Sequence, residues 1–185
     1  MSFPAAALVA FALLVPFFAS AHNFITGQRV APVDIADRGE LILQQNELSY
    51  VNWNSAMLTG KVRVLLHIAG RLSAKEMNEA VAEAIAAAHF PPARYQTTTI
   101  VNTDDAIPGS AIFVRSSLES SKKASPQSEF IIDSEGAAKR AWVLKDASSA
   151  LVVLDKQGKV RFAKEGALTS DEINQVISLL QTLLI

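Results

Sequence analysis

The sequence predicts an α/β fold in which a largely parallel central sheet is flanked by helices. Segments typical of strands and helices alternate after residue 60, and a continuously apolar, β-branched strand runs through residues 61–70. A strand of that kind is buried on both faces, as strands inside a helix-covered sheet are. A pair of short strands near the N-terminus adds a β-hairpin to the fold.

The N-terminal hairpin is expected at residues 28–35 and 40–43. Asp37-Arg38-Gly39 separates these two segments, and Asp and Gly suit a tight turn. Residues 44–60 show no regular period, so we expect an irregular segment there.

Two helices have recognisable starts. The first is expected over residues 73–89, where small and apolar residues recur at four-residue spacing and give one apolar face. Ser73 is followed three residues later by Glu76, which is the pattern of a capping box. Thr169 and Glu172 repeat the pattern before the closing helix, whose apolar residues face the core.

The elements between these two helices follow in chain order. They are a strand at 95–102, a helix at 110–124, a strand at 130–132, a short strand or helix at 137–143, and a hairpin of 151–154 with 160–163. The middle helix is expected to turn Phe113, Val114 and Leu118 inward. Lys122 and Lys123 lie at its C-terminal end, where the helix dipole favours cations.

Residues 1–21 are expected to be a secretory signal peptide. They carry no charged side chain, hold an apolar run from Ala5 to Phe18, and end in the small-x-small pattern of a signal-peptidase site, which places cleavage between Ala21 and His22. The run is shorter than the roughly 20 residues of a spanning helix, so an uncleaved membrane anchor is the lesser alternative. We therefore expect residues 22–185 to form a single domain in the periplasm, with no membrane span after signal removal.

Composition excludes several classes of function. The 185-residue chain has a formal net charge of -1, without the clustered basic residues that displace counterions from nucleic acid. It contains no cysteine, which excludes dithiol exchange, thiol-based peroxidase chemistry and metal binding through thiolates. We expect no nucleic-acid partner and no cofactor.

The order of the elements resembles the thioredoxin-like fold of peroxiredoxins and exported thiol-disulfide proteins, most clearly over residues 61–78 and 151–166. The resemblance aligns Gly70-Arg71-Leu72-Ser73 with the Cys-x-x-Cys motif, which stands at the start of a helix. It also places Ser149 where such proteins carry a cis-proline. Both reactive elements are therefore replaced.

The chain resembles more specifically the YtfJ family of periplasmic proteins. The phrases that carry this resemblance are 97–109 (TTTIVNTDDAIPG), 113–123 (FVRSSLESSKK), 151–155 (LVVLD) and 27–30 (GQRV). The family implies the fold but no biochemical activity. A label of transcriptional regulator is attached to it, and an export signal, the lack of a helix-turn-helix pattern and a near-neutral charge argue against that label.

The predicted ligand groove lies beside Gly70, Arg71, Ser73 and Ser149. Ser73 is interpreted mainly as a helix cap and alternatively as a nucleophile served by His67. Arg71 is either a solvated side chain or part of an anion site. We expect Gly70 to end its strand with a backbone geometry that favours glycine.

The leading functional hypothesis is a periplasmic binding or adaptor module without redox activity. Its partner would be an unknown periplasmic protein, peptide or small ligand. The alternatives are a hydrolase using Ser73 and His67, an oxidase with copper at a mature N-terminal His22, and a structural or stress-response protein of the envelope.

Overall fold

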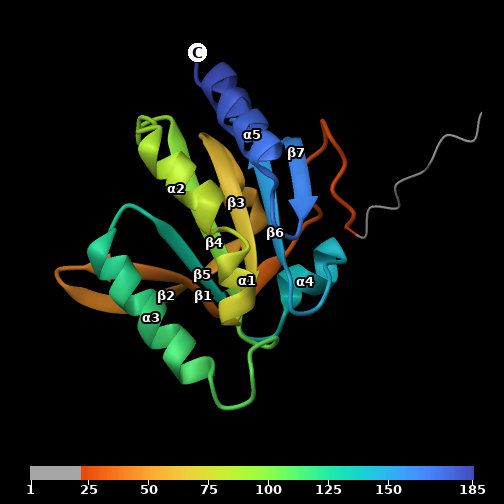
Figure 1. Cartoon of the computed structure of the whole chain (residues 1–185). Coiled ribbons are helices and arrows are strands. Elements are labelled where there is room, and N and C mark those ends of the chain that lie inside the picture. The colour runs from red at the N-terminus through yellow and green to blue at the C-terminus, as the bar shows by residue number, and fades with distance from the viewer. Residues whose placement is uncertain (1–21) are drawn as a thin grey trace, which may run out of the picture.

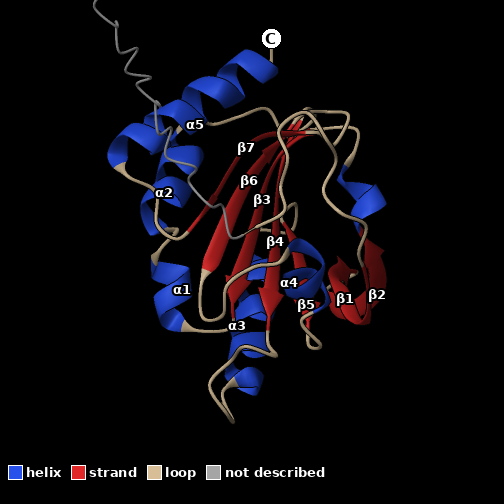
Figure 2. Cartoon of the chain, turned by 90° about the vertical axis from the view of Figure 1, so that its right-hand side faces the viewer, coloured by secondary structure: helices blue, strands red, loops and turns tan. Residues whose placement is uncertain are grey.

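The computed structural model describes residues 22–185, which form a seven-stranded sheet with helices on both faces (Figures 1 and 2). The strand order is β2-β1-β5-β4-β3-β6-β7. Only the β3–β4 and β4–β5 pairs are parallel, so the sheet is mixed and not largely parallel. The strands are β1 (Asp34–Gln44), β2 (Glu47–Asn54), β3 (Val62–Ala69), β4 (Tyr95–Asn102), β5 (Glu129–Asp133), β6 (Ser149–Leu154) and β7 (Val160–Glu165). The helices are η1 (Ser55–Leu58, a 3-10 helix), α1 (Leu72–Glu76), α2 (Glu79–Ala87), α3 (Ala111–Ala124), α4 (Ala137–Trp142) and α5 (Ser170–Leu183).

The central strand β3 divides two hydrophobic cores. Leu66 packs with α2 and α5 in what we call the α5-side core. Leu65 packs with Trp142 of α4 in the α4-side core. Successive side chains of a strand point to opposite faces, so the apolar run of β3 exists because both faces are covered.

An N-terminal hairpin is present, but its predicted strands and turn were wrong, because residues 34–35 and 40–43 belong to the single strand β1, which pairs with β2. The turn lies at Gln45 and Asn46, which have φ angles of 49° and 69°. The segment around Gly39 is a bulge inside β1 instead. Gly39 has a φ of +78°, and a Cβ there would lie 2.1 Å from the carbonyl oxygen of Val51 on β2. The glycine therefore permits a close approach of two strands, and residues 47–58 form β2 and η1 where we expected irregular chain.

The predicted helix at 73–89 is interrupted between α1 and α2. Asn78 is buried, and its Nδ2 donates to the carbonyl of Ala74 at 3.0 Å and to Ser149 Oγ at 2.6 Å. A side chain that binds the carbonyl of the preceding turn competes with regular helix hydrogen bonds. The break thus places an asparagine against the start of β6.

Most other predicted elements are confirmed. β4 has the expected bounds, α3 and the β6–β7 hairpin lie within a few residues of theirs, and residues 137–142 are helical. In α5 the capping box is present, with Thr169 Oγ1 accepting from the Glu172 amide at 3.3 Å and the Glu172 carboxylate accepting from the Thr169 amide at 2.7 Å. The orientation of α3 differs, because Phe113 is 74% exposed.

The N-terminal segment of the described chain runs along α4 and β7. The amide of Asn23 donates to the carbonyl of Trp142 at 3.1 Å, and that of Gly27 donates to Val160 at 2.7 Å. The ring of Phe24 lies 5.7 Å from the ring of Trp142. The predicted signal peptide lies outside the described residues, and among residues 22–185 no helix combines the length and apolarity that crossing a membrane requires.

Candidate functional site

The predicted groove starts at Gly70, where the chain leaves the end of β3. The Gly70 amide donates to the carbonyl of Asn102 at 2.8 Å. A Cβ at Gly70 would lie 3.0 Å from both that carbonyl oxygen and the Cβ of Ala106. The φ of Gly70 is not positive, so glycine is needed here for close approach of the β4–α3 loop and not for an unusual backbone conformation.

Arg71 is engaged by Asp105. Its Nε donates to the Asp105 carbonyl at 2.7 Å, and its Nη2 lies 3.3 Å from Asp105 Oδ1. The other carboxylate oxygen, Oδ2, accepts from the amide of Ala147 at 2.5 Å. This Arg71–Asp105–Ala147 clasp joins the start of α1, the β4–α3 loop and the segment before β6.

Ser73 does not cap the helix as we predicted. The N-cap position of α1 is Arg71, with no side-chain cap hydrogen bond, because the helix starts at Leu72. Ser73 is therefore an exposed residue inside the first turn.

Ser149 does not face an open groove. It is 1% exposed, accepts from Asn78 and donates to the carbonyl of His67 at 3.1 Å. Both hydrogen-bonding roles of its hydroxyl are used inside the fold. The described residues contain no cis peptide bond, and the proline position is thus filled by a buried polar contact.

His67 and Ser73 lie on opposite faces of the sheet. The His67 ring packs edge-on against Trp142, with the ring centres 6.4 Å apart in the α4-side core. α1 is followed by Asn78, which contacts Ser149 on the α5 side. Burial lowers the pKa of His67 to about 4, opposed by the nearby Asp105 carboxylate. This geometry does not bring a base to the Ser73 hydroxyl.

His22 lies at one end of a row of rings. Its ring centre is 5.0 Å from that of Phe24, which continues through Trp142 to His67. Its Nδ1 accepts from the Phe24 amide at 3.3 Å. Two aromatic rings thus separate the two imidazoles, and within residues 22–185 no three His, Cys, Asp or Glu side chains group as metal ligands.

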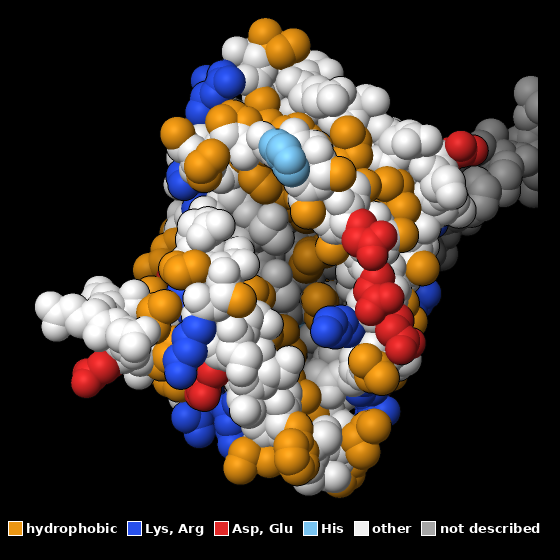
Figure 3. Space-filling model, turned by 60° about the vertical axis from the view of Figure 1, so that its left-hand side comes forward, with side chains coloured by type: hydrophobic (Ala, Val, Ile, Leu, Met, Phe, Trp, Pro, Cys, Tyr) orange, Lys and Arg blue, Asp and Glu red, His pale blue; other side chains and the backbone are white. Residues whose placement is uncertain are grey.

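The structure reveals an apolar surface that we did not predict. We call it the apolar rim and define it by four side chains that are each at least 56% exposed: Leu72, Ile107, Ile112 and Phe113. The clasp brings the start of α1 to the β4–α3 loop, and Ser110 Oγ donates to the carbonyl of Ile107 and fixes the start of α3 beside it. Hydrophobic side chains gather at the lower end of the face shown in Figure 3. The only available signal was the apolar pair Ile112-Phe113 at a helix start, and of these two residues we had assigned Phe113 to the core.

Replacing Asp105 with alanine is expected to lower the free energy of unfolding by about 2 kcal/mol, because the Ala147 amide and Arg71 lose a charged acceptor. Urea titration measures this loss. Asp104→Ala is the matched control, since Asp104 is the adjacent, exposed carboxylate, and it should change stability by less than about 0.5 kcal/mol. Equal effects of the two changes would show that the clasp does not stabilise this end of the sheet.

Comparison with known proteins places the chain among proteins of unassigned activity. A family model described as a bacterial protein of unknown function (YtfJ_HI0045) matches residues 24–183. The uncharacterised Escherichia coli K12 protein YtfJ is 64% identical over 172 residues, which are 93% of this chain and 94% of that protein. An uncharacterised Haemophilus influenzae protein is 45% identical over 163 residues, 88% of this chain and 89% of its own.

Solved structures share the architecture. A candidate protein disulfide isomerase of Bacteroides thetaiotaomicron superimposes with a TM-score of 0.60 at 16% identity, covering 88% of this chain and 92% of that one. A thiol-disulfide isomerase of Corynebacterium glutamicum gives 0.51 at 12% identity, covering 85% and 96%. At such identities the likeness establishes the thioredoxin-like fold alone, here in a chain without cysteine.

Proposed function

The chain belongs to the YtfJ_HI0045 family of bacterial proteins of unknown function, and we propose that it is a periplasmic binding or adaptor module that docks an apolar segment of another exported protein. The docking surface is the apolar rim. Dithiol chemistry needs a thiolate, which this chain lacks. Placement in the periplasm rests on the predicted signal peptide.

One observation carries the proposal. Of nine large hydrophobic side chains exposed among the described residues, four form the rim and come from α1, the β4–α3 loop and α3. Single exposed apolar residues are ordinary, whereas a group of them marks an interaction surface. The rim also lies beside Gly70, at the end of the sheet that carries the reactive site in thioredoxin-like proteins.

The clasp supports docking in preference to ligand burial. Arg71, Asp105 and Ser149 fill the predicted groove with their own contacts, so a partner would meet a closed surface bordered by apolar side chains. Phe113, at 74% exposure, is the largest of these and would be the anchor, since aromatic residues dominate binding energy at interfaces.

Site-specific photo-crosslinking in living cells tests the proposal. A photoreactive residue at Phe113 should give a discrete protein adduct in the periplasmic fraction. The same residue at Val51, which is 45% exposed on the edge strand β2, should not. Adding Leu72→Ser and Ile112→Ser should remove the adduct. Adducts of the same size at both positions, none at Phe113, or adducts confined to the cytoplasm would each refute the proposal.

A further inference from the structure

A cleft of about 440 Å³ opens between α2 and the turn that follows α3, above β4. It is a second feature of the molecule, separate from the apolar rim, and Figure 3 shows this face hollowed between two lobes. Clefts that bind small molecules have volumes of roughly 300–1,000 Å³. Its size is therefore sufficient for a small ligand.

The two walls of the cleft differ in chemistry. The α2 wall is apolar and includes Ala82, Ile85 and Ala86, with Phe90 beyond the helix end. The rings of Phe90 and Tyr95 lie 5.1 Å apart at an angle of 44°. The opposite wall is polar and consists of the residues Gln96, Thr97, Gln127 and Ser128. A ligand that fits both walls must present an apolar face and a hydrogen-bonding edge.

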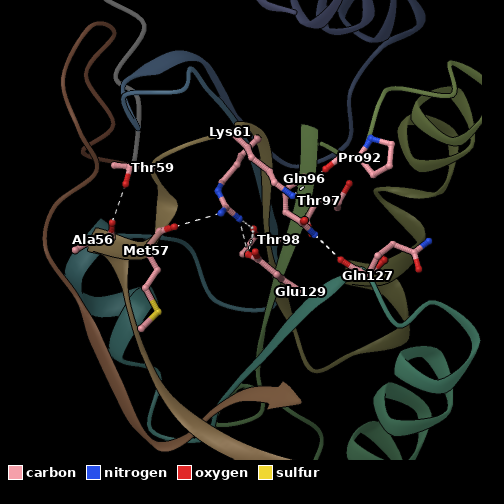
Figure 4. Close-up of polar contacts among 12 residues, drawn as sticks. Ala56, Met57, Thr59, Lys61, Pro92, Gln96, Thr97, Thr98, Gln127 and Glu129 are labelled. Atoms are coloured by element: carbon pink, nitrogen blue, oxygen red, sulfur yellow. Dashed lines mark hydrogen bonds and ion pairs between the residues drawn. The ribbon is translucent and has the colours of Figure 1, made fainter. Parts of the chain in front are cut away.

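Several polar groups on that wall have capacity left for a ligand. Gln96 Nε2 donates to the carbonyls of Thr97 at 3.1 Å and Gln127 at 2.8 Å (Figure 4). Its Oε1 accepts no hydrogen bond from residues 22–185. The hydroxyls of Tyr95 and Thr97 bind one another at 2.9 Å, so one hydroxyl hydrogen of the pair stays available. Burial raises the pKa of Tyr95 to about 12, which keeps its hydroxyl protonated.

The cleft has no Asp, Glu, Lys or Arg among its lining residues. The imidazole of His89 is part of the lining, and its Nδ1 lies 2.6 Å from the carbonyl oxygen of Ala86. The nearby Lys61 ammonium is engaged with the carbonyl of Pro92 at 2.8 Å. Burying an unpaired carboxylate or phosphate there would cost more desolvation free energy than hydrogen bonds from neutral donors would recover. The ligand should therefore be uncharged.

We propose that this cleft binds a short, uncharged saccharide. The C–H face of a sugar ring would pack on Phe90, whose ring lies against that of the buried Tyr95, while its hydroxyls would bond with Gln96, Thr97 and Gln127. An acyl chain would leave the amide wall unsatisfied, which is unfavourable for buried polar groups. The proposal is independent of docking at the rim, because the two surfaces share no residue.

The test uses two neutral probes, N,N′-diacetylchitobiose and maltotriose, titrated into the mature protein and followed by amide chemical shifts. At least one should bind at millimolar concentration and perturb Thr97 and Gln127. Ala86→Leu fills the cleft from an exposed helix position and should weaken binding by at least about tenfold. Ala87→Leu makes the same change at the next, exposed position of α2, outside the lining, and should leave affinity unchanged.

The remaining outcomes contradict the proposal. Failure of both saccharides to perturb the cleft would overturn it, as would equal losses in the two leucine variants. Perturbation of the cleft by decanoate or trialanine without any by the saccharides would assign the site to another ligand class. Rim variants should still bind saccharide, so failure here and failure of the docking proposal are distinguishable.

Discussion

Replacing Arg63 with methionine is expected to lower the free energy of unfolding by about 3 kcal/mol, because Glu129 then loses its charged partner inside the fold. Arg63 is 6% exposed on β3, and its Nη1 donates to Glu129 Oε2 at 2.5 Å and to Thr98 Oγ1 at 2.8 Å. Its Nη2 donates to the carbonyl of Met57 in η1 at 3.2 Å. Methionine keeps the apolar stem, so the loss reports the polar contacts. Urea unfolding at neutral pH measures it.

Two controls separate this pair from an ordinary surface pair. Arg161→Met removes the partner of Asp155 from a longer bridge of 3.3 Å in which Arg161 is 45% exposed, and the cost should stay below about 1 kcal/mol. Adding Glu129→Gln to Arg63→Met should recover part of the lost stability, because position 129 then carries no unpaired charge. If Arg63→Met cost no more than Arg161→Met, burial of the Arg63–Glu129 pair would not matter.

A second large effect is expected with pH. The free energy of unfolding should fall by about 3 kcal/mol through His67 alone as the pH decreases from 6.5 to about 4. Burial lowers the pKa of His67 to about 4 from an ordinary value of 6.5, with Lys139 lowering it further and Asp105 opposing. Above pH 6.5 the ring is neutral in both the folded and the unfolded chain. Between pH 6.5 and about 4, His67 is protonated in the unfolded chain but stays neutral in the folded protein. Below about pH 4 it is protonated in both states.

The variant His67→Leu isolates this contribution. Its stability should decline less steeply between pH 6.5 and 4 than that of the parent, and the difference should be nearly constant below pH 4. Other acid-sensitive groups are present in both proteins and cancel in the comparison. His89→Gln, at an exposed position, should retain the parent slope. Parallel pH profiles for His67→Leu and the parent would mean that the folded protein accommodates the charged ring.

Local sequence patterns predicted the elements that have strong periodicity. They failed where contacts between distant residues determine the local structure. The apolar residues of β3, β4 and α5 recur with the spacing that a buried strand or a one-sided helix requires. The observed bounds of these elements agree closely with the predicted ones. The hairpin turn was misplaced because Gly39 lies in a bulge of β1. A glycine is required there by the close approach of Val51 on the neighbouring strand. β2 was missed because it is an edge strand with many exposed positions, and its sequence therefore lacks alternation.

The candidate site was predictable in position but not in content. The strand-to-helix junction at Gly70 follows from the sequence alone. The clasp depends on Asp105 and Ala147, which are 42 residues apart, and the burial of Ser149 depends on Asn78 interrupting a helix. No local spacing encodes these contacts. Phe113 was assigned to the core because apolar character alone does not distinguish a buried face from an interaction surface.

The attachment of the N-terminal segment also fixes an order of assembly. Asn23 Nδ2 binds the carbonyl of Ala141, which lies 118 residues later, and Gly27 binds Val160. When Phe24 leaves the ribosome, Ala141 and Val160 have not yet been synthesised. The apolar ring of Phe24 therefore stays uncovered during most of translation. Residues 23–27 are thus anchored only once the chain through β7 is available, which gives a chaperone that recognises unfolded apolar chain a long interval in which to act.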